Sequence, residues 1–327
     1  MATMNDVAKL AGVSRGTVSN YINGGNVKPA SQKRIQSAID QLHYVPNTAA
    51  RQLKTSRSDL VVFILPTTRT PLFAELTYKV QRALQQQGMK MILCNSNNDV
   101  EQERDYIQMA KMQKAAGIIT MSYSNSLMEA GRDLPVVSIE KQISKEIPCV
   151  SADNYQGGYI AARALHEAGA EHLLMVTRTT EKTRSNFGLR VKGFVDFCQE
   201  KHIAHEVFEV HAHEAMFYVK LEQELREKFK MALPYDGIFA VADQYADFME
   251  NILHSLNIQV PQQVQIIGFD GGKMYVDQPR HISSIRQPVD AIAECCVKQL
   301  MAILHGKDVP SKYVTLPVNF VKGQTTC

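Results

Sequence analysis

The chain has 327 residues, 45% of them hydrophobic, and a formal net charge of +3. This length suits two or three compact units, and the composition is that of an ordinary globular protein. No apolar run approaches the roughly 20 residues of a membrane-spanning helix, and no basic-then-apolar leader opens the sequence. We therefore disfavour membrane and exported proteins and expect a cytoplasmic location.

Positive charge is concentrated at the start of the chain. Residues 1–58 hold eight Lys or Arg and two acidic residues, a balance of +6, so the remaining residues carry −3. A basic segment on a mildly acidic body is typical of a protein that contacts phosphates with one end only. Small helical domains are often basic without binding nucleic acid, so charge alone does not decide the matter.

The segment AGVSRGTVSNYING at residues 11–24 contains G-V-S-R-G, which fits the G-x-S-x-G pattern of an esterase nucleophile elbow. In that reading Ser14 would be a nucleophile, on a turn that leaves a buried strand and enters a helix. The upstream residues instead have helical spacing, with Val7, Leu10 and Ala11 apolar. Too little chain precedes them to build a sheet, so we predict that Ser14 caps a helix.

Two short helices flank this serine. The first is predicted over Met4–Ala11 and begins with a capping pair, Thr3 and Asp6. Gly12 permits the backbone angles of the turn that follows. The second helix is predicted over Arg15–Ile22, with Val18 and Ile22 facing inward.

A third helix is expected to start at Ser31 and to share an apolar stripe with the first two. Its inward residues are Ile35, Ala38, Ile39 and Leu42. The outward face of the second helix carries Arg15, Gly16, Thr17, Ser19 and Asn20. This arrangement is typical of a helix-turn-helix domain that reads DNA.

The segments MNDVAKLAGVSRGTVSNYING and HYVPNTAARQL resemble the lactose repressor family of bacterial transcription regulators, over about residues 3–57. The resemblance implies DNA contacts at Thr3, Ser14, Arg15, Gly16, Thr17, Ser19, Asn20, Asn23, Tyr44, Asn47, Ala50, Arg51, Leu53 and Lys54. Two positions depart from the family pattern: Asn20 replaces a common arginine, and Gly16 lacks a side chain often used for base contact. Arginine reads guanine whereas asparagine prefers adenine, so Arg15 is the main candidate base reader.

A hinge follows this domain. Pro46 ends the preceding segment, and Asn47 can cap a helix over Thr48–Leu53 that is too short to be stable alone. The resemblance implies that this hinge helix folds on the operator, where Leu53 wedges between bases in the minor groove. The alternative is a frayed linker with an incidental leucine.

After residue 59, apolar runs such as LVVFIL alternate with amphipathic segments such as LFAELTYKVQRALQQQG, in two successive series. This pattern predicts an α/β fold with doubly wound parallel sheets in two lobes, and a ligand between strand ends. The resemblance implies the same two-lobed, periplasmic-binding-protein-like effector domain. The expected organisation is a helix-turn-helix domain (1–46), a hinge (47–58) and an effector-binding and dimerisation domain (59–327). The N-lobe is expected at about 59–154 and 287–315, and the C-lobe at about 155–286 and 316–327.

The cleft is expected to bind a ligand without catalysis, since no phosphate loop, G-x-G-x-x-G motif or nucleophile–base pair stands out. Charge-assisted hydrogen bonds and aromatic faces are what hold sugars. Carried over by position, the resemblance implies effector contacts at Phe73, Tyr123, Glu140, Arg184, Arg190, His213, Asp243 and Asp270. Arg190 and Asp270 match positions that face the ligand in the resembled family. As alternatives, Phe73 can be plain core and Arg190 can pair structurally with Asp243 or Asp270.

The segment TRTTEKTRSNFGLR is unusually basic, with Arg178, Lys182, Arg184 and Arg190. Arginine clusters hold phosphate bidentately, so a sugar phosphate is one interpretation and a solvated loop is the other. His211 and His213 could suit a metal ion, but surface or cleft-lining histidines are commoner. None of the six cysteines has C-x-x-C spacing. We predict no metal and no cofactor.

These features predict a transcription regulator that represses carbohydrate-use genes under the allosteric control of a sugar or sugar phosphate. The alternatives are a nucleobase or other non-sugar ligand, or a two-lobed solute receptor without a DNA role. The receptor would need a leader and no basic head. No leucine heptads follow NFVKGQTTC, so a homodimer on a near-palindromic operator is expected rather than a coiled-coil tetramer.

If Arg15 reads a base, Arg15→Ala should reduce sequence preference more than overall DNA affinity. A bidentate base contact discriminates by about 1–3 kcal/mol, whereas a phosphate contact carries no sequence information. Titrating operator and scrambled duplexes at several salt concentrations separates the two roles. A uniform loss of affinity on both duplexes would make Arg15 a phosphate contact.

Overall fold

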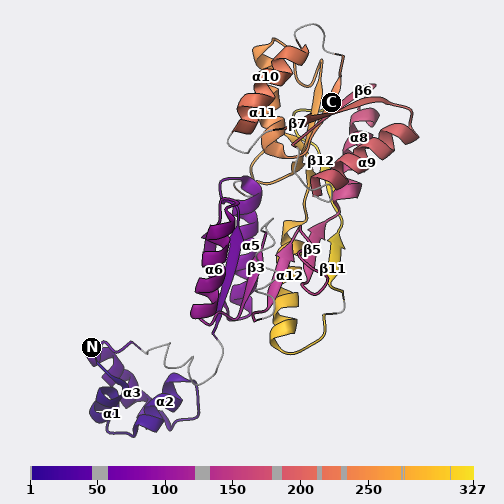
Figure 1. The fold of residues 1–327 in the computed structure, drawn as a ribbon. Coiled ribbons are helices and arrows are strands. Elements are labelled where there is room, and N and C mark those ends of the chain that lie inside the picture. The colour runs from indigo at the N-terminus through magenta and orange to yellow at the C-terminus, as the bar shows by residue number, and fades with distance from the viewer. Residues whose placement is uncertain are drawn as a thin grey trace. The chain divides into compact units, whose positions relative to one another are not determined.

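The computed structural model describes residues 2–45, 58–121, 133–178, 186–211, 216–229, 234–273, 275, 277–309 and 311–327. The chain forms two compact units, Met1–Ser58 and Asp59–Cys327 (Figure 1). Each is described by itself.

The first unit contains three helices, α1 (Met4–Ala11), α2 (Arg15–Ile22) and α3 (Pro29–Leu42). The capping pair predicted for α1 is confirmed: Asp6 N donates to Thr3 Oγ1 at 3.3 Å, and Thr3 N donates to Asp6 Oδ2 at 2.8 Å. Gly12 then ends α1 with φ +62°, in the left-handed region that favours glycine.

Ser14 is the N-cap of α2, since its Oγ accepts from Thr17 N at 3.1 Å. This geometry excludes the nucleophile elbow, because the serine follows a helix and its turn. The predicted start of α3 at Ser31 was wrong by two residues. Pro29 occupies the first turn, where its missing N–H needs no partner, and the cap residue Lys28 makes no side-chain bond.

The second unit contains two sheets. The first has the strand order β11-β5-β4-β3-β1-β2, with its paired strands parallel. Its strands are β1 (Leu60–Leu65), β2 (Lys90–Asn95), β3 (Gly117–Thr120), β4 (Val136–Ile139), β5 (Cys149–Ala152) and β11 (Tyr313–Leu316). The helices beside it are α5 (Pro71–Gln86), α6 (Val100–Met112) and α12 (Val289–Leu304).

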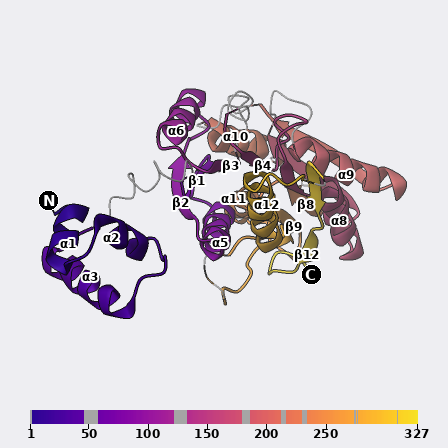
Figure 2. The same ribbon diagram turned by 90° about the horizontal axis from the view of Figure 1, so that it is seen from below.

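Both faces of this sheet are buried, as the alternation along β1 makes clear. Val61, Phe63 and Leu65 join the core formed with α5 and α12, whereas Val62 and Ile64 join the core formed with α6. Figure 2 shows α6 on one side of the strands and α5 and α12 on the other. Burial on both faces explains why LVVFIL is continuously apolar.

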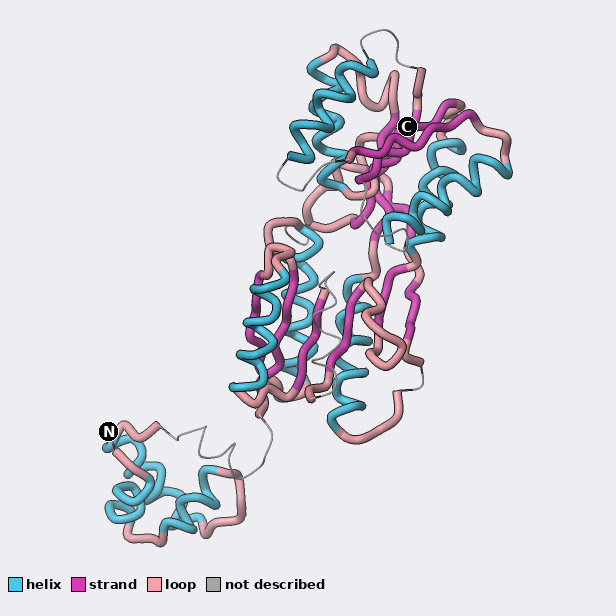
Figure 3. The backbone as a smooth tube through the Cα atoms, viewed as in Figure 1, coloured by secondary structure: helices cyan, strands magenta, loops and turns pink. Residues whose placement is uncertain are grey.

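The second sheet has the strand order β12-β10-β9-β8-β6-β7, and only β12, among its described strands, runs antiparallel to its neighbour. Its strands are β6 (His172–Arg178), β7 (Ala204–Val210), β8 (Gly237–Ala240), β9 (Gln265–Asp270), β10 (Ser283–Arg286) and β12 (Asn319–Val321). The helices are α8 (Asn154–Glu167), α9 (Asn186–Glu200), α10 (Phe217–Phe229) and α11 (Asp243–Ser255). Figures 1 and 3 show α8 and α9 on one side of this sheet and α10 and α11 on the other.

The two sheets define an N-lobe and a C-lobe, and the chain passes between them at residues 152–154, 286–289 and 316–319. The α/β architecture predicted from the alternating runs is confirmed. Within the described ranges, no helix has the length and apolar character needed to cross a membrane.

Candidate functional site

In the first unit, α2 presents the predicted DNA-contacting face to solvent. Arg15, Gly16 and Asn20 are exposed, whereas Thr17 and Ser19 are half-buried. The hydroxyls are used inside the domain: Ser14 Oγ lies 2.8 Å from Thr17 Oγ1, and Ser19 Oγ accepts from Asn23 Nδ2 at 3.3 Å. The exposed Arg15 and Asn20 are thus the side chains of α2 best placed to reach a base edge, and their role stays a prediction.

Thr3 and Tyr44 stand apart from this face. Thr3 is exposed but its hydroxyl is engaged in the cap of α1. Tyr44 is 8% exposed and packs with Val7, Ala11 and Ile35 in the helical core, so its ring supports the domain. Their DNA contacts also stay predictions.

Eight of the predicted site residues lie outside the described residues. They are Asn47, Ala50, Arg51, Leu53 and Lys54 of the hinge, and Tyr123, Arg184 and His213 of the effector domain. The hinge helix predicted over 48–53 lies outside them as well.

In the second unit, the central charged group is Arg190 on α9. Its side chain is only 4% exposed. Nε donates to Asn154 Oδ1 at 2.8 Å, Nη1 donates to the Val241 carbonyl at 2.5 Å, and the guanidinium lies 3.4 Å from the centre of the Phe269 ring. A buried guanidinium needs such acceptors, because an unpaired buried charge is strongly destabilising.

Glycines allow α8 and α9 to approach closely enough for these contacts. A Cβ on Gly158 would lie 1.9 Å from the Arg190 carbonyl oxygen, and a Cβ on Gly193 would lie 1.9 Å from the Tyr155 carbonyl oxygen. Gly157 likewise leaves room for the Phe269 ring. Any larger residue would separate the helices and move Arg190 away from Asn154.

Glu140 directly follows β4 and is 2% exposed. Its Oε1 accepts from Ala152 N at 2.7 Å, and its Oε2 accepts from Asn154 Nδ2 at 2.9 Å and from Asn186 Nδ2. Its φ of +67° lies in the left-handed region, and such strained residues concentrate at functional sites. The carboxylate therefore joins the end of an N-lobe strand to two C-lobe helices.

Asp270 ends β9 with φ +118°. Its Oδ1 accepts from Gln287 Nε2 at 2.7 Å. Burial raises the pKa of Asp270, an effect that Arg190 and the Gln287 hydrogen bond oppose. The group therefore holds its proton more tightly than an exposed aspartate does.

Asp243 begins α11 and binds the residues around Asp270. Its Oδ1 accepts from Ser284 Oγ at 2.5 Å and its Oδ2 from Gly271 N at 2.7 Å. Burial and then the charge of Asp270 raise the pKa of Asp243. The carboxylate thus ties the turn after β9 to β10, while its predicted effector contact stays untested.

Phe73 and Arg178 are the remaining described candidates. Phe73, on the first turn of α5, is half-buried and packs against the N-lobe core. Arg178 ends β6 and is half-buried. Both remain candidates only by position.

The sequence analysis missed three amide side chains, Asn154, Asn186 and Gln287. Asn154 follows β5, so the rule that ligands gather at the carboxyl ends of parallel strands could have found it. Asn186 was missed because it lies among the basic residues of the segment TRTTEKTRSNFGLR. Gln287 was missed because it lies in the segment 286–289, where the chain passes between the lobes. Each bonds to a predicted residue far away in sequence.

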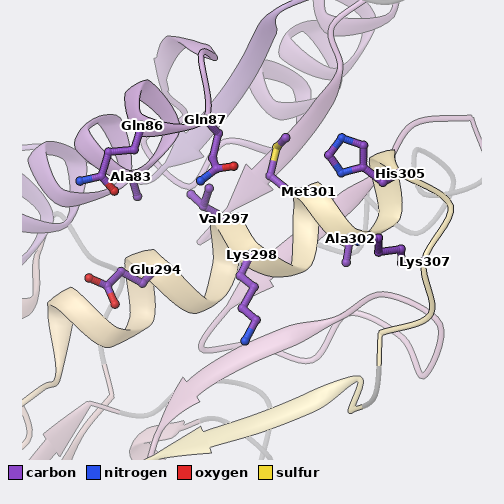
Figure 4. Close-up of a pocket in the computed structure, with 10 residues that line it drawn as sticks. All are labelled: Ala83, Gln86, Gln87, Glu294, Val297, Lys298, Met301, Ala302, His305 and Lys307. Carbon is purple, nitrogen blue, oxygen red and sulfur yellow. The ribbon is translucent and has the colours of Figure 1, made fainter.

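A groove lies elsewhere, between the C-terminal halves of α5 and α12 (Figure 4). It has a volume of about 450 Å³, and none of the predicted effector residues lines it. Its lining residues include Gln87, Val297, Lys298, Met301 and His305.

Comparison with known proteins now identifies the chain. Residues 3–47 match the family described as bacterial regulatory proteins, lacI family, and residues 162–326 match the periplasmic binding protein-like domain. The sucrose operon repressor of Pediococcus pentosaceus is 34% identical over 98% of both chains. The chain belongs to the LacI family of bacterial regulatory proteins.

Two further relatives are similar to this LacI-family regulator. The sucrose operon repressor of Streptococcus mutans is 32% identical over 99% of both chains. A solved regulator from Alkaliphilus metalliredigens, complexed with D-xylulofuranose, is 26% identical and has a TM-score of 0.71. That structure covers 83% of this chain and 100% of its own. The helix-turn-helix and two-lobed fold implied by the sequence resemblance are confirmed.

The raised pKa values of Asp243 and Asp270 make folding stability pH-dependent. A carboxyl whose pKa is higher folded than unfolded stabilises the protein while protonated, and this contribution is lost as pH rises through the folded value. As pH rises from about 5 to about 8, the free energy of unfolding should therefore fall less in Asp270→Asn than in the wild type. Urea unfolding at both pH values measures the difference.

Asp196→Asn is the matched control. Its hydrogen bond from Lys192 lowers the pKa of Asp196, so this group stays ionised throughout that interval and its replacement should shift both measurements equally. A wild-type pH slope in Asp270→Asn would contradict the assignment.

Proposed function

We propose that this LacI-family regulator represses carbohydrate-use genes and that a sugar or sugar phosphate bound between its lobes controls its affinity for DNA. The observation that carries the proposal is the convergence of Glu140, Arg190 and Asp270 in a chain with a helix-turn-helix head. Charge-assisted donors and acceptors of this kind fix the hydroxyls of a sugar. No catalytic step and no cofactor enter the proposal.

The proposed effector carries a ketofuranose ring, free or phosphorylated. Two relatives are sucrose operon repressors, and sucrose contains a fructofuranosyl ring. The Alkaliphilus regulator holds D-xylulofuranose, another ketofuranose. In the proposed pose Asp270 accepts from ring hydroxyls, and Asn186 exchanges its bond to Glu140 for one to the sugar.

Phosphorylation of the sugar would give the basic segment a role. Arg178 ends β6 directly before the segment that contains Lys182 and Arg184. A phosphate bound there would sit at the carboxyl end of a parallel strand, near the N-terminus of α9. A free sugar gives these basic residues no role in binding.

A thermal-shift panel on the full-length protein tests the effector class. The panel contains sucrose, D-fructose, D-ribose, their phosphate esters and purine bases. A ligand at about 100 times its Kd adds about 2.7 kcal/mol to stability, enough to raise the Tm by a few degrees. A phosphosugar hit predicts that Arg184→Ala weakens the ester more than the free sugar, by roughly 10-fold for one lost charge-assisted contact of about 1.4 kcal/mol.

Unchanged relative affinity in Arg184→Ala would remove the phosphate clamp, leaving a free sugar as effector. A hit among the purines alone would replace the sugar with a nucleobase. No stabilisation by any member of the panel would count against the proposed effector class.

We also propose that the regulator acts in the bacterial cytoplasm as a homodimer on a near-palindromic operator. Two heads read two half-sites, and the hinge residues Leu53 and Arg51 enter the central minor groove. An exposed apolar edge supports pairing: β2 stands at one end of the strand order with Leu93 exposed, and α5 exposes Tyr78. Light scattering should give twice the chain mass, and a monomeric or tetrameric mass would contradict the dimer.

A further inference from the structure

An ion pair links the two lobes beside the candidate site. Arg286, the last residue of β10 in the C-lobe, faces Glu75 on α5 in the N-lobe. Nη2 lies 2.5 Å from Oε1 and Nη1 donates to Oε2 at 2.9 Å, so the pair is bidentate. Each side chain is only 17% exposed. Such paired, planar contacts are the most directional of the charged interactions.

The same guanidinium holds the turn that follows Asp270. Arg286 Nη1 also donates to the Gly271 carbonyl at 2.9 Å, and Arg280 Nη1 donates to that same oxygen at 2.9 Å. Gly271 has φ +62°, and a Cβ on it would lie 2.9 Å from the Arg286 Cα. The turn therefore has little freedom to move without Arg286.

The turn also touches α5 directly. A Cβ on Gly272 would lie 2.7 Å from the backbone nitrogen of Leu72 and 2.9 Å from the carbonyl carbon of Pro71. The first turn of α5 thus meets the Asp270 turn through backbone contact, and Glu75 on the next turn meets it through Arg286. Two adjacent contacts couple one helix of the N-lobe to one turn of the C-lobe.

We propose that Glu75 and Arg286 are positioning residues that transmit effector occupancy at Asp270 to helix α5. This inference rests on the proposed function, because it assumes an effector at Asp270. A ligand that pulls on the Asp270 carboxylate shifts the Gly271 carbonyl, the shared guanidinium follows, and Glu75 carries the displacement into the N-lobe. Neither residue needs to touch the effector.

A second ion pair on the same helix provides the control. Lys79, one turn beyond Glu75, lies 2.5 Å from Asp290 on α12. Both ends of this pair belong to the N-lobe, and the Asp290 side chain is 64% exposed. Loss of this pair removes a salt bridge from α5 without cutting any contact between lobes.

The test compares full-length wild type, Glu75→Gln, Arg286→Gln and Lys79→Gln. Fluorescence anisotropy gives the operator Kd with and without saturating sucrose, D-fructose or their phosphate esters, and the ratio of the two Kd values measures coupling. Coupling in allosteric proteins is typically about 5- to 150-fold. We expect the ratio to fall toward about 1 in Glu75→Gln and Arg286→Gln and to remain at the wild-type value in Lys79→Gln.

Sugar affinity separates transmission from binding. Calorimetric titration should show Glu75→Gln binding the sugar within about 3-fold of the wild type, less than a 1 kcal/mol change. A Glu75→Gln protein that keeps the wild-type coupling ratio overturns the proposal. Equal loss of coupling in Lys79→Gln also overturns it, since any weakening of α5 would then suffice.

Amide hydrogen exchange on the sugar-free proteins tests whether Glu75 holds the turn at residues 271–273. This test does not depend on the effector being a sugar. Glu75→Gln should accelerate exchange at residues 271–273 of the C-lobe, as well as in the first turn of α5. Lys79→Gln should leave residues 271–273 at the wild-type rate. Unchanged exchange at residues 271–273 in Glu75→Gln overturns the link, whichever ligand the regulator binds.

Discussion

The buried guanidinium of Arg190 is the constraint on which the C-lobe side of the site depends. A charge with 4% exposure must find acceptors inside the protein, and it finds them on α8, on the segment after β8 and on the face of Phe269. Those contacts exist only because Gly158 and Gly193 let α8 and α9 approach to backbone contact. The buried charge therefore depends on three features together: the close crossing of α8 and α9, the position of Asn154, and the Phe269 ring before Asp270.

The carboxylates of Glu140, Asp243 and Asp270 accept different hydrogen bonds, which give them different roles. Glu140 accepts from donors on both lobes, so it fixes how the N-lobe strand end meets α8 and α9. Asp243 accepts hydrogen bonds from Ser284 and Gly271 with its two oxygens, and so fixes the turn after β9. Among the described residues, the Asp270 carboxyl accepts one side-chain hydrogen bond, from Gln287, and burial raises its pKa. Position in the sequence could not separate these roles, because all three stand beside strand or helix ends.

Local signals predicted the parts of the fold that depend on local physics. The bounds of α1 and α2 follow from the side-chain caps Thr3 and Ser14, whereas α3 begins at a proline without a side-chain cap and was placed two residues late. Glu140 and Asp270 were identifiable from strand ends, and their contact with an effector stays a prediction. Asn154 follows a strand end and could have been found in the same way, whereas Asn186 and Gln287 were not identifiable, since amides are common throughout the sequence. Only the three-dimensional approach of segments 14 to 46 residues apart gives these three a role.

The contacts of Arg190 inside the C-lobe and the Glu75–Arg286 contact between the lobes differ in strength. The Arg190 network joins groups that all belong to the C-lobe, and separating them would leave a buried charge unpaired, at a cost of several kcal/mol. The Glu75–Arg286 pair crosses between lobes at 17% exposure, where water can solvate both partners once they part. Such pairs are worth about 1 kcal/mol or somewhat more, which is the order of allosteric coupling energies, about 1–3 kcal/mol. The C-lobe is thus rigid enough to keep its half of the site, while the Glu75–Arg286 pair between lobes is weak enough for a small ligand to redistribute.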